Sequence, residues 1–205
     1  MIEPTRTGAR PKGKSTVEVW EALKKLDRHA SCECRFDWLF LPRSDERRGA
    51  LSEIFDALID DWKSGGRERH PKKADCRLDE MLSDARIKGP SRIIEADFYL
   101  PSFGMMVEFD ERQHFSAERG VTLEFYDPKE FSFDVRRWRD LCREIEAIDI
   151  DPPWRDWARA YRDTVRDFAA KNQGLRMLHL YDGDFRHVKR DPEALTKKLQ
   201  QCLEI

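Results

Sequence analysis

Residues 95–110, EADFYLPSFGMMVEFD, form two apolar runs that carry acidic residues at alternate positions and are separated by a short break. Alternation with a period of two is typical of β-strands, and the flanking Pro101 and Gly104 are typical of a turn. The segment therefore predicts a hairpin whose strands cover about 92–101 and 104–110.

A turn at Ser102–Phe103 fixes which residues of the two strands face each other. A hairpin centred there places Asp97 directly opposite Glu108, and the period of two puts Asp110 on the same face. The other face carries only apolar side chains, namely those of Ala96, Phe98, Leu100, Met105, Val107 and Phe109. We therefore expect one face of the hairpin in the core and three carboxylates gathered on the other.

Three carboxylates on one sheet face raise each other's pKa unless a cation compensates their charge. Asp97, Glu108 and Asp110 offer the hard oxygen ligands that Mg²⁺ or Mn²⁺ prefers. The competing interpretation is a solvated face with incidental acidic residues, and a register slip of one residue would remove the pairing. Because acidic residues are depleted in strands and these fall in register, the pattern favours a metal site.

The longer segment ADFYLPSFGMMVEFDERQHF, residues 96–115, resembles the PD-(D/E)XK nuclease superfamily, in particular its subgroup related to very-short-patch repair endonucleases. Members typically have Asp-Phe and a proline, followed by Glu-x-Asp-Gly and a histidine. The matching residues here are Asp97, Phe98, Pro101, Glu108, Asp110, Gln113 and His114. The resemblance extends over residues 92–203, where the similar features are Arg162–Asp163, Gly174, the apolar run 175–181 and Asp191–Pro192–Glu193.

This resemblance implies a restriction-endonuclease-like α/β fold and an endonuclease that hydrolyses DNA phosphodiester bonds with Mg²⁺ or Mn²⁺. Asp97 and Glu108 would hold the metal ion with Asp110 as a further ligand, and His114 would act as general base or orient the attacking water. The accessory residues that it suggests are Glu18, Arg162 and Asp163. The implied partner is nucleic acid, with DNA as the expected substrate, and many such nucleases form homodimers to cut both strands.

Two positions depart from the subgroup's pattern. Glu111 stands where members have glycine, and Asp110 stands where the superfamily's classical lysine stabilises the attacking water. His114, Arg162 or Lys171 could take over that role. The alternative function is a nucleic-acid-binding protein of the same fold with weak or no catalysis, and a non-nuclease protein with a carboxylate-rich metal site also stays open.

The rest of the chain predicts further helices and strands around the hairpin. Helical periodicity covers about 15–30, 45–62, 132–147, 154–172 and 191–203, a short helix fits 78–88, and strands fit about 34–41 and 175–181. An irregular stretch is expected at about 111–131. This order predicts a mixed α/β fold, with a sheet flanked by helices and an N-terminal helical extension.

We expect a flexible basic tail over residues 1–14 and a single endonuclease-like domain over 15–205. Within that domain, 15–91 would carry the N-terminal helices, a strand and a basic loop, and 92–203 would carry the acidic motif. The basic loop, residues 63–77, has six Lys or Arg against two acidic residues. Such runs are often solvated loops, but the candidate contacts to DNA phosphates are Arg67, Arg69, Lys72 and Lys73.

A second concentration of arginine lies between residues 134 and 167, where eight arginines interleave with nine acidic residues. Guanidinium groups suit phosphate, but this mixture also suits a salt-bridged helix surface. Both interpretations stay open for these helices.

The 205 residues include 38 Lys and Arg against 40 Asp and Glu, for a net charge of −2. This balance excludes a nonspecific polycation, so nucleic-acid binding would need local basic patches. No apolar run is long enough to cross a membrane, and the N-terminus lacks the apolar core of a signal peptide, so a cytoplasmic location is expected. The sequence has no P-loop, GxGxxG, HExxH or GxSxG motif to support a nucleotide-dependent motor, a zincin or an α/β-hydrolase.

Five scattered cysteines predict reduced, packed thiols. The competing interpretation is a metal site that combines Cys32, Cys34 and Cys76 with either His29 or His70.

Overall fold

The computed structural model describes residues 2–8, 10–11, 14–43, 46–84 and 92–204, with the side chains of residues 14, 15, 67 and 84 left out of the description. The chain divides into two compact units, each assembled from segments that are distant in the sequence. The first consists of Met1–Leu39, Ile93–Glu111 and Ala169–Ile205, and the second of Phe40–Arg92 and Arg112–Phe168.

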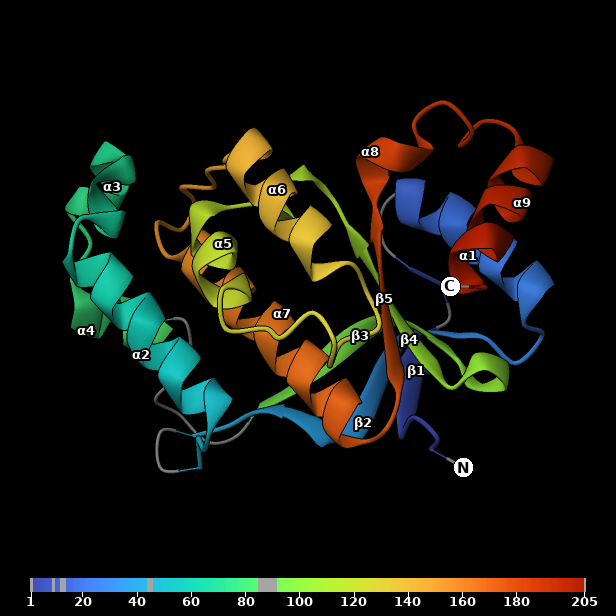
Figure 1. Ribbon diagram of the computed structural model, residues 1–205, viewed down its shortest axis with the longest axis horizontal. Coiled ribbons are helices and arrows are strands. Elements are labelled where there is room, and N and C mark those ends of the chain that lie inside the picture. The colour runs from blue at the N-terminus through green and yellow to red at the C-terminus, as the bar shows by residue number, and fades with distance from the viewer. Residues whose placement is uncertain (1, 9, 12–13, 44–45, 85–91, 205) are drawn as a thin grey trace. The chain divides into compact units, whose positions relative to one another are not determined.

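A mixed five-stranded sheet with the order β1-β2-β3-β4-β5 confirms the expected α/β class (Figure 1). Pairing is antiparallel between β1 and β2 and between β3 and β4, and parallel between β4 and β5. The strands are β1 (Arg6–Gly8), β2 (Ser31–Leu41), β3 (Arg92–Leu100), β4 (Met105–Asp110) and β5 (Arg176–Tyr181). Helices flank this sheet.

The hairpin predicted from residues 95–110 is formed by β3 and β4. Phe98 pairs with Val107 and Leu100 with Met105, which is the expected register. Pro101–Phe103 form a single 3-10 turn, η2, and Gly104 follows it with a φ of 57°. Glycine adopts this left-handed conformation without the steric cost that a side chain would add, so the chain can reverse direction here.

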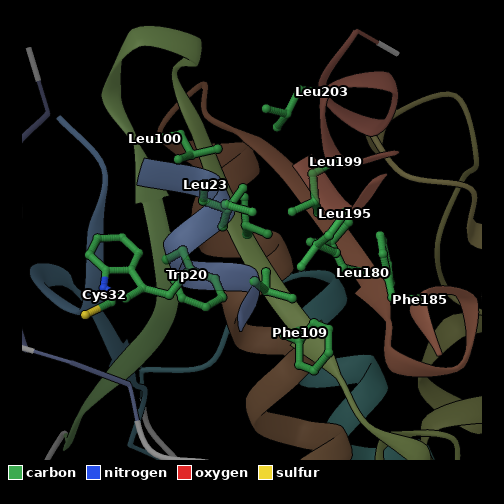
Figure 2. Packing of buried hydrophobic residues seen from close by; sticks show 14 of the residues in the cluster. Trp20, Leu23, Cys32, Leu100, Phe109, Leu180, Phe185, Leu195, Leu199 and Leu203 are labelled. Carbon is green, nitrogen blue, oxygen red and sulfur yellow. The ribbon is translucent and has the colours of Figure 1, made fainter. Parts of the chain in front are cut away.

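The apolar face of the hairpin packs against two helices, α1 (Lys14–Leu26) and α9 (Pro192–Leu203). The ring of Trp20 stacks on that of Phe98 at 5.9 Å, and Leu195 and Leu199 join the same buried cluster. Figure 2 shows side chains from both helices and from β4 converging there. Each such side chain contributes roughly 1.5–3 kcal/mol when it is fully buried, so this cluster fixes the hairpin within the first unit.

The N-terminal segment differs from the expected flexible tail. Residues 6–8 form β1, and the backbone N–H of Thr5 donates to the carbonyl of Arg35 at 2.8 Å. The hydroxyl of Tyr99 also donates to the carbonyl of Ile2 at 2.8 Å. The edge of β2 offers backbone groups that need partners, and this segment supplies them.

Four helices make up most of the second unit: α2 (Ala50–Lys63), α5 (Ala117–Leu123), α6 (Val135–Ile145) and the first part of α7 (Arg155–Asn172). Phe55 packs edge-on against Trp157 and Tyr161 in its core. Helix α5 lies in the stretch expected to be irregular, and Ser116 caps it by accepting a hydrogen bond from the backbone N–H of Arg119. The short elements of this unit are η1 (Gly66–Arg69), α3 (Pro71–Ala74), α4 (Leu78–Asp84) and η3 (Arg112–His114).

The remaining short helix, α8 (Asp182–Phe185), belongs to the first unit and follows β5 directly. The predicted helix at 78–88 is confirmed up to residue 84, and its last residues lie outside the description. Within the described part of the chain, no helix combines the length and the apolar composition that a membrane crossing requires.

Candidate functional site

Asp97 and Glu108 are joined across the β3–β4 hairpin by two reciprocal hydrogen bonds. Oε1 of Glu108 accepts from the backbone N–H of Asp97 at 3.2 Å, and Oδ2 of Asp97 accepts from the backbone N–H of Phe109 at 2.9 Å. Each carboxylate is therefore anchored through one oxygen to the opposite strand. The structure brings these two residues together at the place that the hairpin register predicts.

Asp110 lies on the same face of β4 but is engaged by the neighbouring strand. Oδ2 of Asp110 is 2.7 Å from Nδ1 of His179, and both side chains are almost fully buried. The parallel pairing of β4 with β5 aligns Glu108 with His179, so the imidazole lies beside this acidic face. Sequence reasoning missed His179, because the run 175–181 does not reveal which strand it pairs with.

Burial distinguishes the three carboxylates. Glu108 and Asp110 are each 3% exposed, whereas Asp97 is half-buried. Ionised carboxylates are rarely this buried without partners or a cation, so the acidic face is not the solvated surface of the competing interpretation.

The neighbouring thiols do not favour a cysteine metal site. Burial first, and then Cys32 and Glu108, raise the pKa of the Cys34 thiol well above its ordinary value. Burial likewise raises the pKa of Cys32. Cys32 and Cys34 are both buried free thiols, which agrees with the packed, reduced thiols that the sequence predicts. Cys76 is also a buried free thiol, and it lies in the second unit.

The donor chemistry of this face suits a hard divalent cation. Among the described residues, no group of three or more His, Cys, Asp or Glu side chains is arranged to hold a metal ion. Mg²⁺, however, usually takes only one or two carboxylates and completes its shell with water and substrate phosphate. Asp97 and Glu108 fit that smaller requirement, and Asp110 is held by His179 instead.

His114 belongs to the second unit, where it pairs with Asp163. Its Nδ1 lies 3.0 Å from Oδ2 of Asp163, and Oδ1 of the same carboxylate accepts from Arg166 at 2.6 Å. Burial alone would raise the pKa of Asp163, but His114 and Arg166 outweigh it and hold that pKa well below its ordinary range. Asp163 therefore stays ionised and orients the imidazole, while the catalytic role of His114 stays a prediction.

A cavity of about 360 Å³ adjoins this pair within the second unit. We call it the arginine pocket, and it is lined by His114, Arg155, Arg159, Arg162, Asp163 and Arg166. It thus includes Arg162 and Asp163, the accessory residues suggested by the resemblance.

The structure corrects one of the four candidate DNA contacts of the basic segment, Lys73, and places a second, Arg69, in ion pairs. Lys73 is 1% exposed and lies 3.1 Å from Glu118 and 2.8 Å from Asp156. Arg69 pairs with Asp61 at 2.5 Å and with Glu118 at 3.0 Å. The buried Lys73 is therefore not available to DNA phosphates, whereas Arg69, whose side chain is 27% exposed, stays a predicted contact.

The other candidates have mixed outcomes. Lys72 is exposed and remains available to a phosphate, whereas the side chain of Arg67 lies outside the description. Glu18 is half-buried on α1, and no described contact joins it to the acidic face of the hairpin. Its accessory role therefore gains no support.

None of the family models, curated proteins or solved structures compared with the chain matches it.

Proposed function

We propose that the protein is a metal-dependent endonuclease that hydrolyses DNA phosphodiester bonds. The observation that supports this best is the anchored pair Asp97 and Glu108, held side by side by hydrogen bonds of 3.2 and 2.9 Å across the hairpin. Two fixed carboxylates of this kind are what a Mg²⁺ or Mn²⁺ ion shared with a phosphate requires. The mixed sheet, with an antiparallel hairpin next to a parallel strand, is compatible with the proposed restriction-endonuclease-like fold.

Each residue has a stated task in this proposal. Asp97 and Glu108 would hold the cation through their carboxylate oxygens. A bound divalent cation lowers the pKa of water and neutralises the charge that develops on the scissile phosphate. Asp110 is the last residue of β4, and its contact with His179 fixes the orientation of its carboxylate. It adds negative charge beside Asp97 and Glu108.

His114 is the proposed general base. This role comes from the resemblance, and within the second unit Asp163 contacts Nδ1 of His114 at 3.0 Å and orients the imidazole. A homodimer, which would allow both DNA strands to be cut, is part of the same proposal.

The test is nicking of supercoiled plasmid with Mg²⁺ or Mn²⁺, with an EDTA control. Asp97→Asn and Glu108→Ala should each lose at least about 100-fold in rate, the equivalent of about 2.7 kcal/mol of transition-state stabilisation. Asp37→Asn is the matched control, because this exposed acid lies on β2 of the same unit and should leave the rate unchanged. Equal activity in all four proteins would point to a contaminating nuclease and refute the assignment.

A second readout does not depend on turnover. Mn²⁺ titrated into the wild type should raise its melting temperature and should have a much smaller effect on Asp97→Asn. An equal shift in both proteins would place the cation elsewhere.

The second candidate is a nucleic-acid-binding protein with the same fold and little catalysis. The contact between Asp110 and His179 favours this candidate. Asp110 stands at the position of the superfamily's classical lysine, and a carboxylate there supplies no positive charge to an attacking water. Salt-dependent retention of DNA without any nicking, in both cations, would support this candidate over the endonuclease.

A further inference from the structure

The arginine pocket concentrates positive charge on one stripe of α7. Arg155, Arg159, Arg162 and Arg166 follow one another at spacings of four, three and four residues, so they share one helix face. Like charges at these spacings destabilise a helix by roughly 0.2–0.5 kcal/mol per pair. Anions beside these four arginines would therefore stabilise the helix by compensating their positive charge.

Carboxylates of the second unit compensate only part of this charge. Asp149 accepts from Arg155 at 3.3 Å and from Arg159 at 3.1 Å, so one carboxylate serves two guanidinium groups. Asp163 accepts from Arg166 at 2.6 Å and also contacts His114. The four arginines thus outnumber the three carboxylates that contact this stripe, Asp149, Asp156 and Asp163. Asp156, which also lies 3.2 Å from Arg159, is shared with the buried Lys73.

Arg162 is the arginine of this stripe whose guanidinium has no carboxylate ion pair among the described contacts. In the described part of the chain, no hydrogen bond or ion pair ties down its guanidinium, although the side chain is half-buried and lines the cavity. Burial, followed by the charges of Arg166 and Arg92, lowers the pKa of Arg162 from its ordinary value. An anion in the cavity would remove this penalty.

We propose that the arginine pocket binds a phosphate oxyanion, with Arg162 as its principal ligand. The cavity is large enough for such a group, at about 360 Å³, and its lining is charged or polar throughout. Guanidinium groups present two parallel N–H donors to a phosphate, and Arg159 keeps donors beyond those used for its carboxylates. Asp163 serves to hold His114 and Arg166 at the edge of the pocket.

The first experiment is a thermal melt of the full chain in EDTA, titrated with inorganic phosphate. Phosphate should raise the melting temperature of the wild type in a saturable way. Arg162→Gln should weaken this binding roughly tenfold or more, the usual loss for a hydrogen bond to a charged group. In phosphate-free buffer the same variant should melt no lower than the wild type, because the substitution relieves repulsion.

Two further variants keep the test sharp. Arg136→Gln removes an exposed arginine from α6 of the same unit and should change phosphate binding less than about twofold. Arg162→Lys retains the charge but loses the planar pair of donors, so its affinity should fall between wild type and Arg162→Gln. Equal phosphate affinity in the wild type and Arg162→Gln would overturn the proposal.

A second arm separates a backbone phosphate from a free one. A fluorescent DNA duplex without terminal phosphates is titrated in EDTA and followed by anisotropy. If Arg162→Gln weakens both phosphate and duplex binding, and lowers the salt slope by about one, the pocket holds a phosphate of the nucleic-acid backbone. If only phosphate binding is weakened, the ligand is a free phosphate or a phosphomonoester.

Neither arm needs Mg²⁺ or turnover, so the outcome is separate from that of the proposed nuclease activity. Asp97→Asn should bind phosphate as the wild type does, even where plasmid nicking is lost.

Discussion

Asp97 and Glu108 of the β3–β4 hairpin accept hydrogen bonds from residues nearby in the chain, whereas Lys73 of the basic segment pairs with residues far away. Asp97 and Glu108 accept hydrogen bonds from residues 12 and 11 positions distant. Lys73 pairs with Glu118 and Asp156, which are 45 and 83 positions distant. The two regions differ in what determines the surroundings of each side chain.

This difference decides whether a charged residue faces a ligand or stabilises the fold. In the hairpin, the alternation of the strands and one tight turn bring like charges together, which the fold alone gives no reason to do. In the basic segment, opposite charges meet in a buried cluster, where Lys73 is 1% exposed and Asp156 is fully buried. The first arrangement suits a divalent cation, and in the second Lys73 neutralises its carboxylate neighbours.

Removing the cation at the centre of the buried cluster should have the largest effect on stability. Lys73→Met keeps the bulk of the side chain but leaves Glu118 and Asp156 buried beside each other, so we expect a loss of about 3–5 kcal/mol in the free energy of unfolding. Urea denaturation measures it. Burial raises the pKa of Asp156 and Lys73 opposes this rise, so part of the loss should be recovered as the pH falls and Asp156 takes up a proton.

Lys72 provides the matched control for that substitution. It is the adjacent residue, carries the same charge and is exposed, so Lys72→Met should change stability by less than about 0.5 kcal/mol. If both lysine variants unfold at the same urea concentration, the basic segment is a solvated loop and the contrast between the two regions is wrong.

The same contrast explains which features of the structure could be predicted from the sequence. The hairpin, its register and the proximity of Asp97 to Glu108 follow from a pattern within 16 residues, and the structure confirms them. His179 could not be predicted, because its contact with Asp110 joins strands 69 positions apart through a parallel pairing. The burial of Lys73 could not be predicted for the same reason, since a run of positive charge gives no indication of distant carboxylates.

Helices and strands were also predicted best where the pattern that forms them lies within one short segment of the chain. The long amphipathic helices were predicted within a few residues, because their apolar stripes repeat over several turns. Helix α5 and strand β1 were missed, since each is short and depends on neighbours from other parts of the chain. The predicted phosphate contact at Lys73 was wrong, because this side chain is buried between carboxylates, whereas the contact at Arg69 stays a prediction.

Asp149 lies at the edge of the buried cluster, so it should contribute less to the free energy of unfolding than Lys73 at the centre. The backbone N–H of Asp149 donates to Asp156 at 2.9 Å, while the Asp149 carboxylate pairs with Arg155 and Arg159 and is 23% exposed. Because the pair is partly solvated, Asp149→Asn should cost about 1 kcal/mol or less at pH 7. Burial alone would raise the pKa of Asp149, but Arg159 and Arg155 outweigh this effect and lower the pKa.

The pH dependence of that cost follows from the direction of the shift. A carboxyl whose pKa is lowered by folding stabilises the protein above its ordinary pKa of about 3.9, and this stabilisation is lost as the pH falls through the folded value. The difference between Asp149→Asn and wild type should therefore be constant from about pH 5 to 8 and shrink below pH 4. A difference that grows on acidification would contradict the ion-pair interpretation.

The smallest effect on stability is expected at the hairpin, and its sign should be opposite. Asp97→Asn and Glu108→Gln keep an oxygen that can accept from the backbone N–H groups of Phe109 and Asp97, so the cross-strand bonds survive. They remove a negative charge from a face that also holds Asp110, so each variant should be unchanged or more stable by up to about 1 kcal/mol in metal-free buffer. Residues kept for a ligand at the expense of stability behave in this way. Urea denaturation in EDTA provides the measurement, and a loss of more than about 2 kcal/mol in either variant would mean that these carboxylates stabilise the fold, as Lys73 and its partners do.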